Sequence, residues 1–210
     1  MKVKQFIYLL LIVSLASCIS KKNTFYTKDY FPLSSGDTLI YQGSYNDKKE
    51  IDTLIISPVT IQNRNCFIHL QPQNISGSKI LLVQNHFGPG LYRYDWKGNL
   101  YSSFVLTKFG LDTIRKKDFF IFLPKKISVG YRNTIINPEK TKQTTLIVDG
   151  IEDLVVNSIL LKNCIKIRLE EFWPKHGNKL TAFVWLQKNE GVVKWIRTTN
   201  RVEELLYRSK

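Results

Sequence analysis

Apolar and polar residues alternate along most of the chain, in short runs that are separated by turn residues. The runs are rich in Ile, Val, Leu, Thr and aromatic residues, a composition that suits a pleated, half-buried surface. Turn signals such as "NISGS", "WKGN" and "PKHGNK" lie between them. The pattern predicts an all-β, mainly antiparallel fold with strands at 38–45, 51–61, 66–71, 79–85, 90–96, 100–107, 119–123, 143–150, 154–161, 164–173, 180–187 and 191–198.

A long helical period is missing from every window of the sequence, so we expect at most one or two short helices. The best helical candidate is "TNRVEELLYR" near the end of the chain, and the same segment fits a last strand equally well. Residues 30–210 are expected to form one domain, because this length can bury a substantial core.

Some predicted strands are apolar on both faces. In 181–187, aromatic residues alternate with small and aliphatic ones, and 119–123 is similar. A strand of this kind is covered on both sides by a second sheet, a helix or a bound apolar ligand. The residues that would line a ligand cavity, or else the core, are Phe120, Phe122, Phe183 and Trp185.

The first seventeen residues have the layout of a secretory signal. Lys2 and Lys4 precede an apolar run from Phe6 to Val13, and small residues follow. The apolar run is shorter than the roughly 20 residues that a membrane-spanning helix needs. Residues 1–17 are therefore predicted to be a cleaved signal peptide, with an uncleaved anchor as the alternative.

The residues "LASC" that end at Cys18 resemble the lipobox of bacterial lipoproteins. In those proteins the signal is removed before the cysteine, which is then acylated. The resemblance implies that Cys18 is the lipid-carrying N-terminus and that residues 18–29 contain a short polar tether. A plain secretory signal with a chance cysteine is the alternative. Since no aspartate follows Cys18, the resemblance further implies an outer-membrane lipoprotein that faces the periplasm.

The chain is strongly basic, with 31 Lys and Arg residues against 17 Asp and Glu residues. The basic residues are scattered, with short clusters at 115–117 and 124–126, and they form no nucleic-acid motif. Export also makes a nucleic acid an unsuitable partner. Anionic lipid, the cell wall and other envelope proteins are the partners that remain.

Cys66 and Cys164 share an oxidising compartment if the chain is exported. Cys66 alternates with Ile68 and Leu70 on an apolar face, whereas Cys164 lies on the polar face of its own strand. Cysteines on opposite faces of their sheets rarely meet, so we predict two unpaired thiols. A β-bulge would be needed to bring them together.

The sequence shows no catalytic constellation. His69, His86 and His176 lack the spacing of metal ligands, and the chain has no Cys-x-x-Cys pair. The adjacent carboxylates Glu170 and Glu171 point to opposite faces of a strand rather than toward one substrate. We therefore expect neither an enzyme nor a cofactor.

A hairpin turn is predicted at 97–99, within "GLYRYDWKGNLY". Tyr92, Tyr94 and Trp96 alternate before this turn and share one face of the strand. Such rings usually form cross-strand packing. Exposed at the edge of a sheet, they would instead form a contact surface.

Both ends of the predicted domain resemble a group of uncharacterised bacterial exported proteins and lipoproteins. The opening "DYFPLSSGDTLIYQG" is similar to that group's "Y-F-P-L-x-x-G" start, with Leu39 at the usual tryptophan position. The closing segment, from "NCIKIRLEEFW" to "GVVKW", is similar to its "C-x-K-I" strand and last hairpin. The resemblance implies a curved antiparallel sheet or half-open barrel, without an established chemistry.

Two functions follow from these predictions. The first is a lipid-anchored, non-catalytic module that docks to other parts of the cell envelope. The second is a carrier that shelters an apolar ligand such as an acyl chain. A carrier needs an internal cavity of hundreds of Å³, whereas a docking module packs the same aromatic residues into its core.

Overall fold

The computed structural model describes residues 23–34, 36–45, 48–61, 63–70, 91–103, 119–137, 139–197 and 201–209. The signal peptide, Cys18, the predicted strand 79–85 and His86 lie outside these residues. The elements are β1 (Thr24–Tyr26), α2 (Thr27–Tyr30), β2 (Thr38–Tyr45), β3 (Lys48–Ile61), β4 (Arg64–Leu70), β5 (Leu91–Tyr94), β6 (Leu100–Ser103), β7 (Phe119–Leu123), β8 (Lys126–Ser128), β9 (Arg132–Ile136), β10 (Gln143–Val156), β11 (Ile159–Trp173), β12 (Asn178–Gln187), β13 (Gly191–Arg197) and β14 (Arg201–Ser209).

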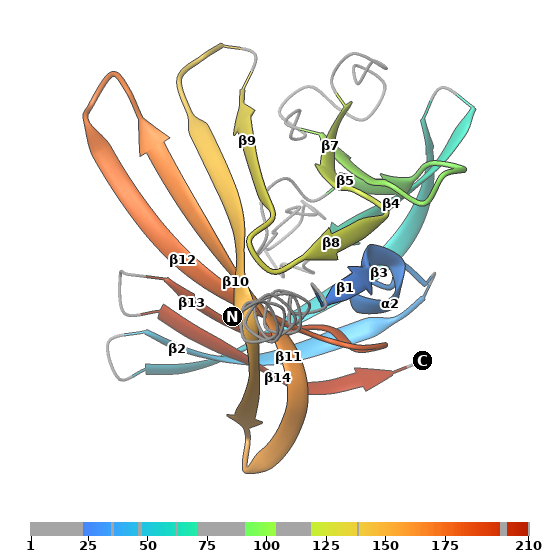
Figure 1. The fold of residues 1–210 in the computed structure, drawn as a ribbon. Helices are drawn as coiled ribbons and strands as arrows, with labels where there is room; N and C mark the ends of the chain where they lie inside the picture. The colour runs from blue at the N-terminus through green and yellow to red at the C-terminus, as the bar shows by residue number, and fades with distance from the viewer. Residues whose placement is uncertain are drawn as a thin grey trace, which may run out of the picture.

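Twelve strands form one antiparallel sheet in the order β7-β6-β5-β4-β3-β2-β14-β13-β12-β11-β10-β9. The sheet curls into a nearly closed barrel, which brings its edge strands β7 and β9 together (Figure 1). At this junction the side-chain amide of Asn133 donates a hydrogen bond to the carbonyl of Ile121 at 3.0 Å. The prediction of a curved, antiparallel all-β fold is confirmed, and α2 is the single short helix of the described residues.

Three details differ from the sequence prediction. The strand predicted at 154–161 instead contains the hairpin turn between β10 and β11, because Asn157 and Ser158 have positive φ angles of 47° and 68°. Of the two alternatives left open for the C-terminal segment, the strand is the one present, because β14 pairs with both β13 and β2. Strands β8 and β9, of three and five residues, were not predicted. The polar tether predicted at 18–29 is too long, because Thr24–Tyr26 is a strand that pairs with β8.

The inward faces of the strands form one large apolar core. It includes Tyr41 and Leu39 from β2, Val184 and Leu186 from β12, and Ile167 from β11. These side chains alternate along each strand with outward-facing ones, as the period of two requires. Burial of this inward face is what holds the barrel closed.

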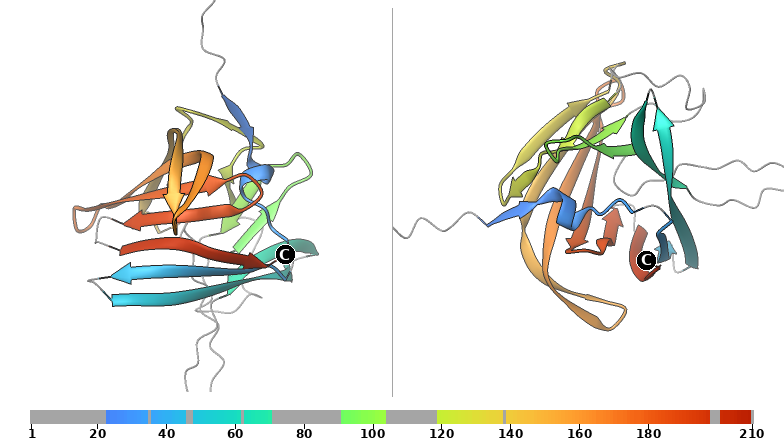
Figure 2. Two further views of the ribbon diagram at one scale, coloured as in Figure 1. Left: turned by 90° about the horizontal axis from the view of Figure 1, so that it is seen from below. Right: turned by 90° about the vertical axis from the view of Figure 1, so that its right-hand side faces the viewer.

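The segment 24–34 lies across one end of the barrel. Figure 2 shows it entering from one side and running between the wall of β9–β12 and the wall of β2–β4. The backbone N–H of Thr27 donates to the carbonyl of Lys125 at 2.9 Å, and that of Asn189 donates to the carbonyl of Asp29 at 2.7 Å. Tyr30 and Phe31 then enter the core, where they are 8% and 3% exposed. We call this end of the barrel the N-terminal end.

The search for membrane-spanning helices returns none among the described residues.

Candidate functional site

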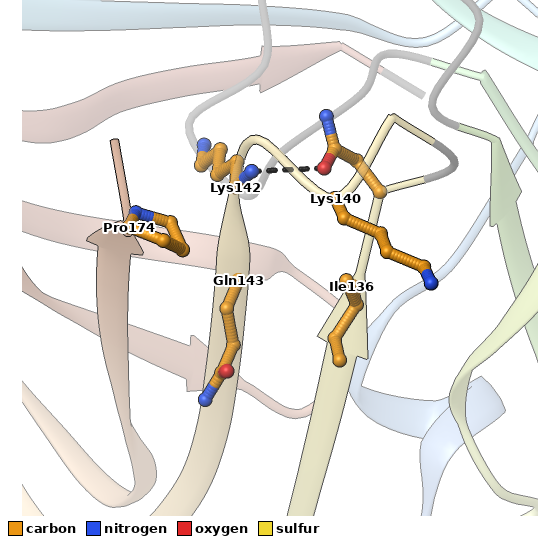
Figure 3. Close-up of a pocket in the computed structure, with 6 residues that line it drawn as sticks. Ile136, Lys140, Lys142, Gln143 and Pro174 are labelled. Atoms are coloured by element: carbon orange, nitrogen blue, oxygen red, sulfur yellow. Dashed lines mark hydrogen bonds between the residues drawn. The ribbon is translucent and has the colours of Figure 1, made fainter. Parts of the chain in front are cut away.

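A groove lies at the far end of the barrel from the N-terminal segment, beside the turn that joins β9 to β10. Its volume is about 470 Å³. The side chains in Figure 3 project from this turn and from the end of β11, and they form a shallow polar and apolar surface. The lining residues are Ile136, Asn137, Lys140, Lys142, Gln143 and Pro174.

Asn137 organises the turn that builds this groove. Its side-chain oxygen accepts a hydrogen bond from the backbone N–H of Lys142 at 2.8 Å, and its amide donates to Oγ1 of Thr141 at 2.8 Å. Lys140 adopts a left-handed conformation with φ of 54°, which asparagine and glycine tolerate better than lysine. The turn is thus held by side-chain hydrogen bonds, and the Lys140 side chain is left exposed.

Three charged residues at this end form a network. Nζ of Lys142 lies 2.5 Å from Oε1 of Glu171, whose other oxygen is 3.6 Å from a guanidinium nitrogen of Arg197. Nζ of Lys142 also lies 5.3 Å from the centroid of the Trp173 ring. Because Glu171 compensates these cations, the groove offers Lys140 together with the exposed Ile136 and Pro174.

Among the described side chains, His176 does not group with Glu170 and Glu171. His176 lies exposed in the β11–β12 turn. Glu170 bonds to Arg168 at 2.7 Å, whereas Glu171 bonds to Lys142. The part of the chain that the structure describes holds no cluster of three His, Cys, Asp or Glu side chains that could bind a metal ion. The side chain of His69 is not among those described.

The four residues predicted to line a cavity or core lie on two faces of the sheet. Phe122 is 2% exposed within the barrel core, 6.1 Å from the Tyr92 ring, and Phe120 packs beside it at 6.5 Å. Phe183 and Trp185 lie 6.2 Å apart in a separate apolar cluster with Cys164 and Val193. One cavity therefore does not contain all four of them.

The separate cluster contains a buried thiol. Sγ of Cys164 lies 3.0 Å from Oε1 of Gln187, and Nε1 of Trp185 donates to Oε1 of Glu152 at 2.6 Å. Burial raises the pKa of the Cys164 thiol to about 11, and the carboxylates of Asp153 and Glu152 add to the increase. Cys66 is also free and buried, so the prediction of two unpaired thiols is confirmed.

The hairpin predicted at 97–99 is present and lies at the N-terminal end. The N–H of Gly98 donates to the carbonyl of Asp95 at 3.0 Å, and Gly98 has a φ of +89°. Tyr92 is fully buried, and the hydroxyl of Tyr94 donates to the carbonyl of Phe31 at 2.6 Å. Trp96 instead is 90% exposed. The cross-strand packing expected of these rings is therefore found for Tyr92 and Tyr94. Trp96 lies in the turn beyond the end of β5 and does not share their face.

No protein-family model and no curated protein matches the sequence. Two solved structures have a partly similar chain path. One is a protein from Bacteroides fragilis, described as exported and as having a YmcC-like fold; it has 13% identity, covers 86% of this chain and 99% of its own, and has a TM-score of 0.48. The other, described as a lipoprotein from Parabacteroides distasonis, has 11% identity, coverage of 85% and 97%, and a TM-score of 0.41. With TM-scores below 0.5, neither structure indicates the function of this chain.

Proposed function

We propose that the protein is a lipid-anchored, non-catalytic docking module of the bacterial cell envelope. In this proposal Cys18 carries the lipid, and the protein sits on the outer membrane and faces the periplasm. The observation that carries the proposal is the attachment of the N-terminal segment to one end of the barrel through β1 and α2. A lipid on Cys18 would hold that end near a membrane and leave the groove at the other end accessible.

The packing of the aromatic residues favours a docking module over a carrier. Tyr30 and Phe31 fill the N-terminal end of the barrel, and the Phe31 ring lies 5.0 Å from that of Tyr92. Phe122, which a carrier would use to line its cavity, is buried in the same core. Side chains packed against each other in this way stabilise the domain and leave the outer surface to bind partners.

The groove beside the β9–β10 turn is the surface that we assign to the partner. Its ordered turn, the exposed Lys140 and the exposed apolar atoms of Ile136 suit another envelope protein or a cell-wall polymer. Protein interfaces combine an apolar core with a polar, solvent-accessible rim. Cross-linking through a photoreactive residue at position 140 would identify that partner, and position 188, an exposed lysine in a different turn, provides the matched control.

Metabolic labelling with an alkyne fatty acid tests the anchor. The wild-type chain should incorporate the label and fractionate with membranes, whereas Cys18→Ala should lose the label. Cys66→Ala is the matched control, because Cys66 is buried and should leave the labelling unchanged. An unlabelled wild-type chain, or a Cys18→Ala chain that keeps its label, would refute the proposal.

A further inference from the structure

Exposed aromatic and lysine side chains gather around the point where the chain enters the barrel. Trp96 is 90% exposed and Tyr26 is 47% exposed. Exposed lysines come from three separate segments: α2, the β5–β6 turn, and the start of β8 with the residue before it. We name this surface the anchor-side face, and it consists of Tyr26, Lys28, Trp96, Lys97, Lys125 and Lys126.

Contacts that run across the three segments make this face continuous. Nζ of Lys126 lies 5.0 Å from the Tyr26 ring, and Nζ of Lys97 lies 5.0 Å from the Trp96 ring. Lys125 joins the two pairs: its N–H donates to the side chain of Asn99 at 2.9 Å. Its carbonyl accepts from Thr27 in the N-terminal segment at 2.9 Å.

The side chain of Lys125 packs across the β5–β6 turn. A Cβ at Gly98 would lie 3.4 Å from Cγ of Lys125, which is ordinary van der Waals contact. The positive φ of Gly98, +89°, is what favours glycine at this position. The turn therefore holds Trp96 and Lys125 on the same side of the molecule.

The charge of the anchor-side face is positive. Its four lysines outnumber Asp29 and Asp95, the two carboxylates that α2 and the β5–β6 turn contribute. Asp95 is engaged within the turn, since its oxygens accept from the N–H and the side-chain amide of Asn99, each at 2.8 Å. The lysines are thus available to an external anion.

We infer that the anchor-side face docks on the anionic surface of the membrane that carries the lipid anchor. The chain from Cys18 to Asn23 has five peptide links, so it spans at most about 18 Å when fully extended. Tryptophan and tyrosine rings favour the headgroup level of a bilayer. Lysines beside them are attracted to anionic headgroups. This inference rests on the proposed lipidation of Cys18.

Quenching of tryptophan fluorescence by brominated lipids tests the inference. The full lipidated chain is placed in vesicles of brominated phosphatidylcholine with phosphatidylglycerol. The contribution of Trp96 is the difference between the wild type and Trp96→Ala. Bromine in the bilayer should quench this Trp96 fluorescence, because Trp96 would lie in the headgroup layer. The Trp96→Ala chain should fold normally, because the side chain is almost fully exposed.

Charge reversal tests the role of the lysines. In the triple variant Lys97→Glu, Lys125→Glu and Lys126→Glu, quenching of Trp96 should be lost while the lipid keeps the protein on the vesicle. Each lost lysine should shift the ratio of docked to undocked protein by about fivefold, which corresponds to about 1 kcal/mol. High salt should have the same effect, because the Debye length falls from about 10 Å at 0.1 M to about 3 Å at 1 M.

The matched control reverses three exposed lysines at the opposite end of the barrel: Lys140→Glu, Lys175→Glu and Lys179→Glu. It makes the same change in net charge and should keep the quenching of Trp96. An unquenched Trp96 in the wild type would overturn the inference, as would equal quenching in pure phosphatidylcholine vesicles or in the Lys97, Lys125 and Lys126 variant. Those results leave the lipidation proposal intact, since fatty-acid labelling of Cys18 measures it separately.

Discussion

Arg208 and Asp37 form a buried ion pair that joins the last strand, β14, to the residue before β2. Nε of Arg208 donates to Oδ2 of Asp37 at 2.9 Å, and the two side chains are 4% and 6% exposed. Nη1 of Arg208 also donates to the carbonyls of Asn189 and Glu190, at 2.9 and 2.8 Å. One guanidinium therefore joins β14, the residue before β2 and the β12–β13 turn.

Replacing Asp37 by alanine should destabilise the protein strongly, because it leaves the Arg208 charge buried without its partner. We expect the free energy of unfolding to fall by about 3–5 kcal/mol. Urea unfolding followed by circular dichroism measures this loss. The control is Arg132→Ala, which removes an exposed pair with Glu170 at 3.9 Å and should cost at most about 1 kcal/mol. Equal losses in the two variants would contradict the assigned role.

The hydroxyl of Tyr41 should stabilise the barrel interior. It donates to the carbonyl of Val192 at 2.9 Å, from a side chain that is 1% exposed. Tyr41→Phe leaves that carbonyl with one bond fewer and should lower the free energy of unfolding by about 1–2 kcal/mol. Tyr26→Phe is the matched control. Because this ring is exposed, the variant should keep the urea midpoint of the wild type. An unchanged midpoint for Tyr41→Phe would show that the interior bond contributes nothing.

Substitution of Phe122 distinguishes a solidly packed core from a core that contains a ligand cavity. Since it is packed in the core, Phe122→Ala should lower the free energy of unfolding by about 3–5 kcal/mol. Native mass spectrometry of the lipidated wild type should give the mass of the chain and its own lipid only. The exposed Trp96 supplies the control, because Trp96→Ala should change the stability by about 0.5 kcal/mol or less. A solvent-extractable extra mass, combined with a small effect of Phe122→Ala, would instead support the carrier.

The Cys164 thiol should resist alkylation in the folded protein. Burial raises its pKa from 9.0 to about 11, so the reactive thiolate is scarce at pH 8. Iodoacetamide at pH 8 should modify neither Cys164 nor the buried Cys66 until urea unfolds the chain, as peptide mass spectrometry would report. Modification of Cys164 at the same rate in folded and unfolded protein would contradict its burial.

The raised pKa of Cys164 also gives a direction for stability at high pH. Between pH 9.0 and about 11 the unfolded thiol is deprotonated while the folded thiol keeps its proton. The unfolded state then binds fewer protons, so stability falls as the pH rises, by up to about 1.4 kcal/mol per pH unit. In Cys164→Ala the decline over this range should be smaller. An identical pH dependence in both proteins would show that the thiol is not linked to folding.

Much of the fold could be read from local patterns in the sequence. The alternation in 164–173 and 180–187 predicts strands β11 and β12, because the period of two follows from backbone geometry within one strand. Glycine at position 98 indicated the β5–β6 turn, since only a few residue types adopt its positive φ readily.

Other features depend on residues far apart in the sequence. "TNRVEELLYR" became β14 because its backbone pairs with β2, which lies more than 150 residues earlier, and such pairing overrides a weak helical preference. The local sequence of Thr24–Tyr26 predicts a polar tether, and the segment is a strand because it pairs with β8. The anchor-side face is of the same kind, because Tyr26, Trp96 and Lys126 come from three segments that only the closed barrel brings together. Local alternation specifies which residues form strands and which face each side chain takes; the partners of those strands, and the surfaces their ends create, follow from packing over the whole chain.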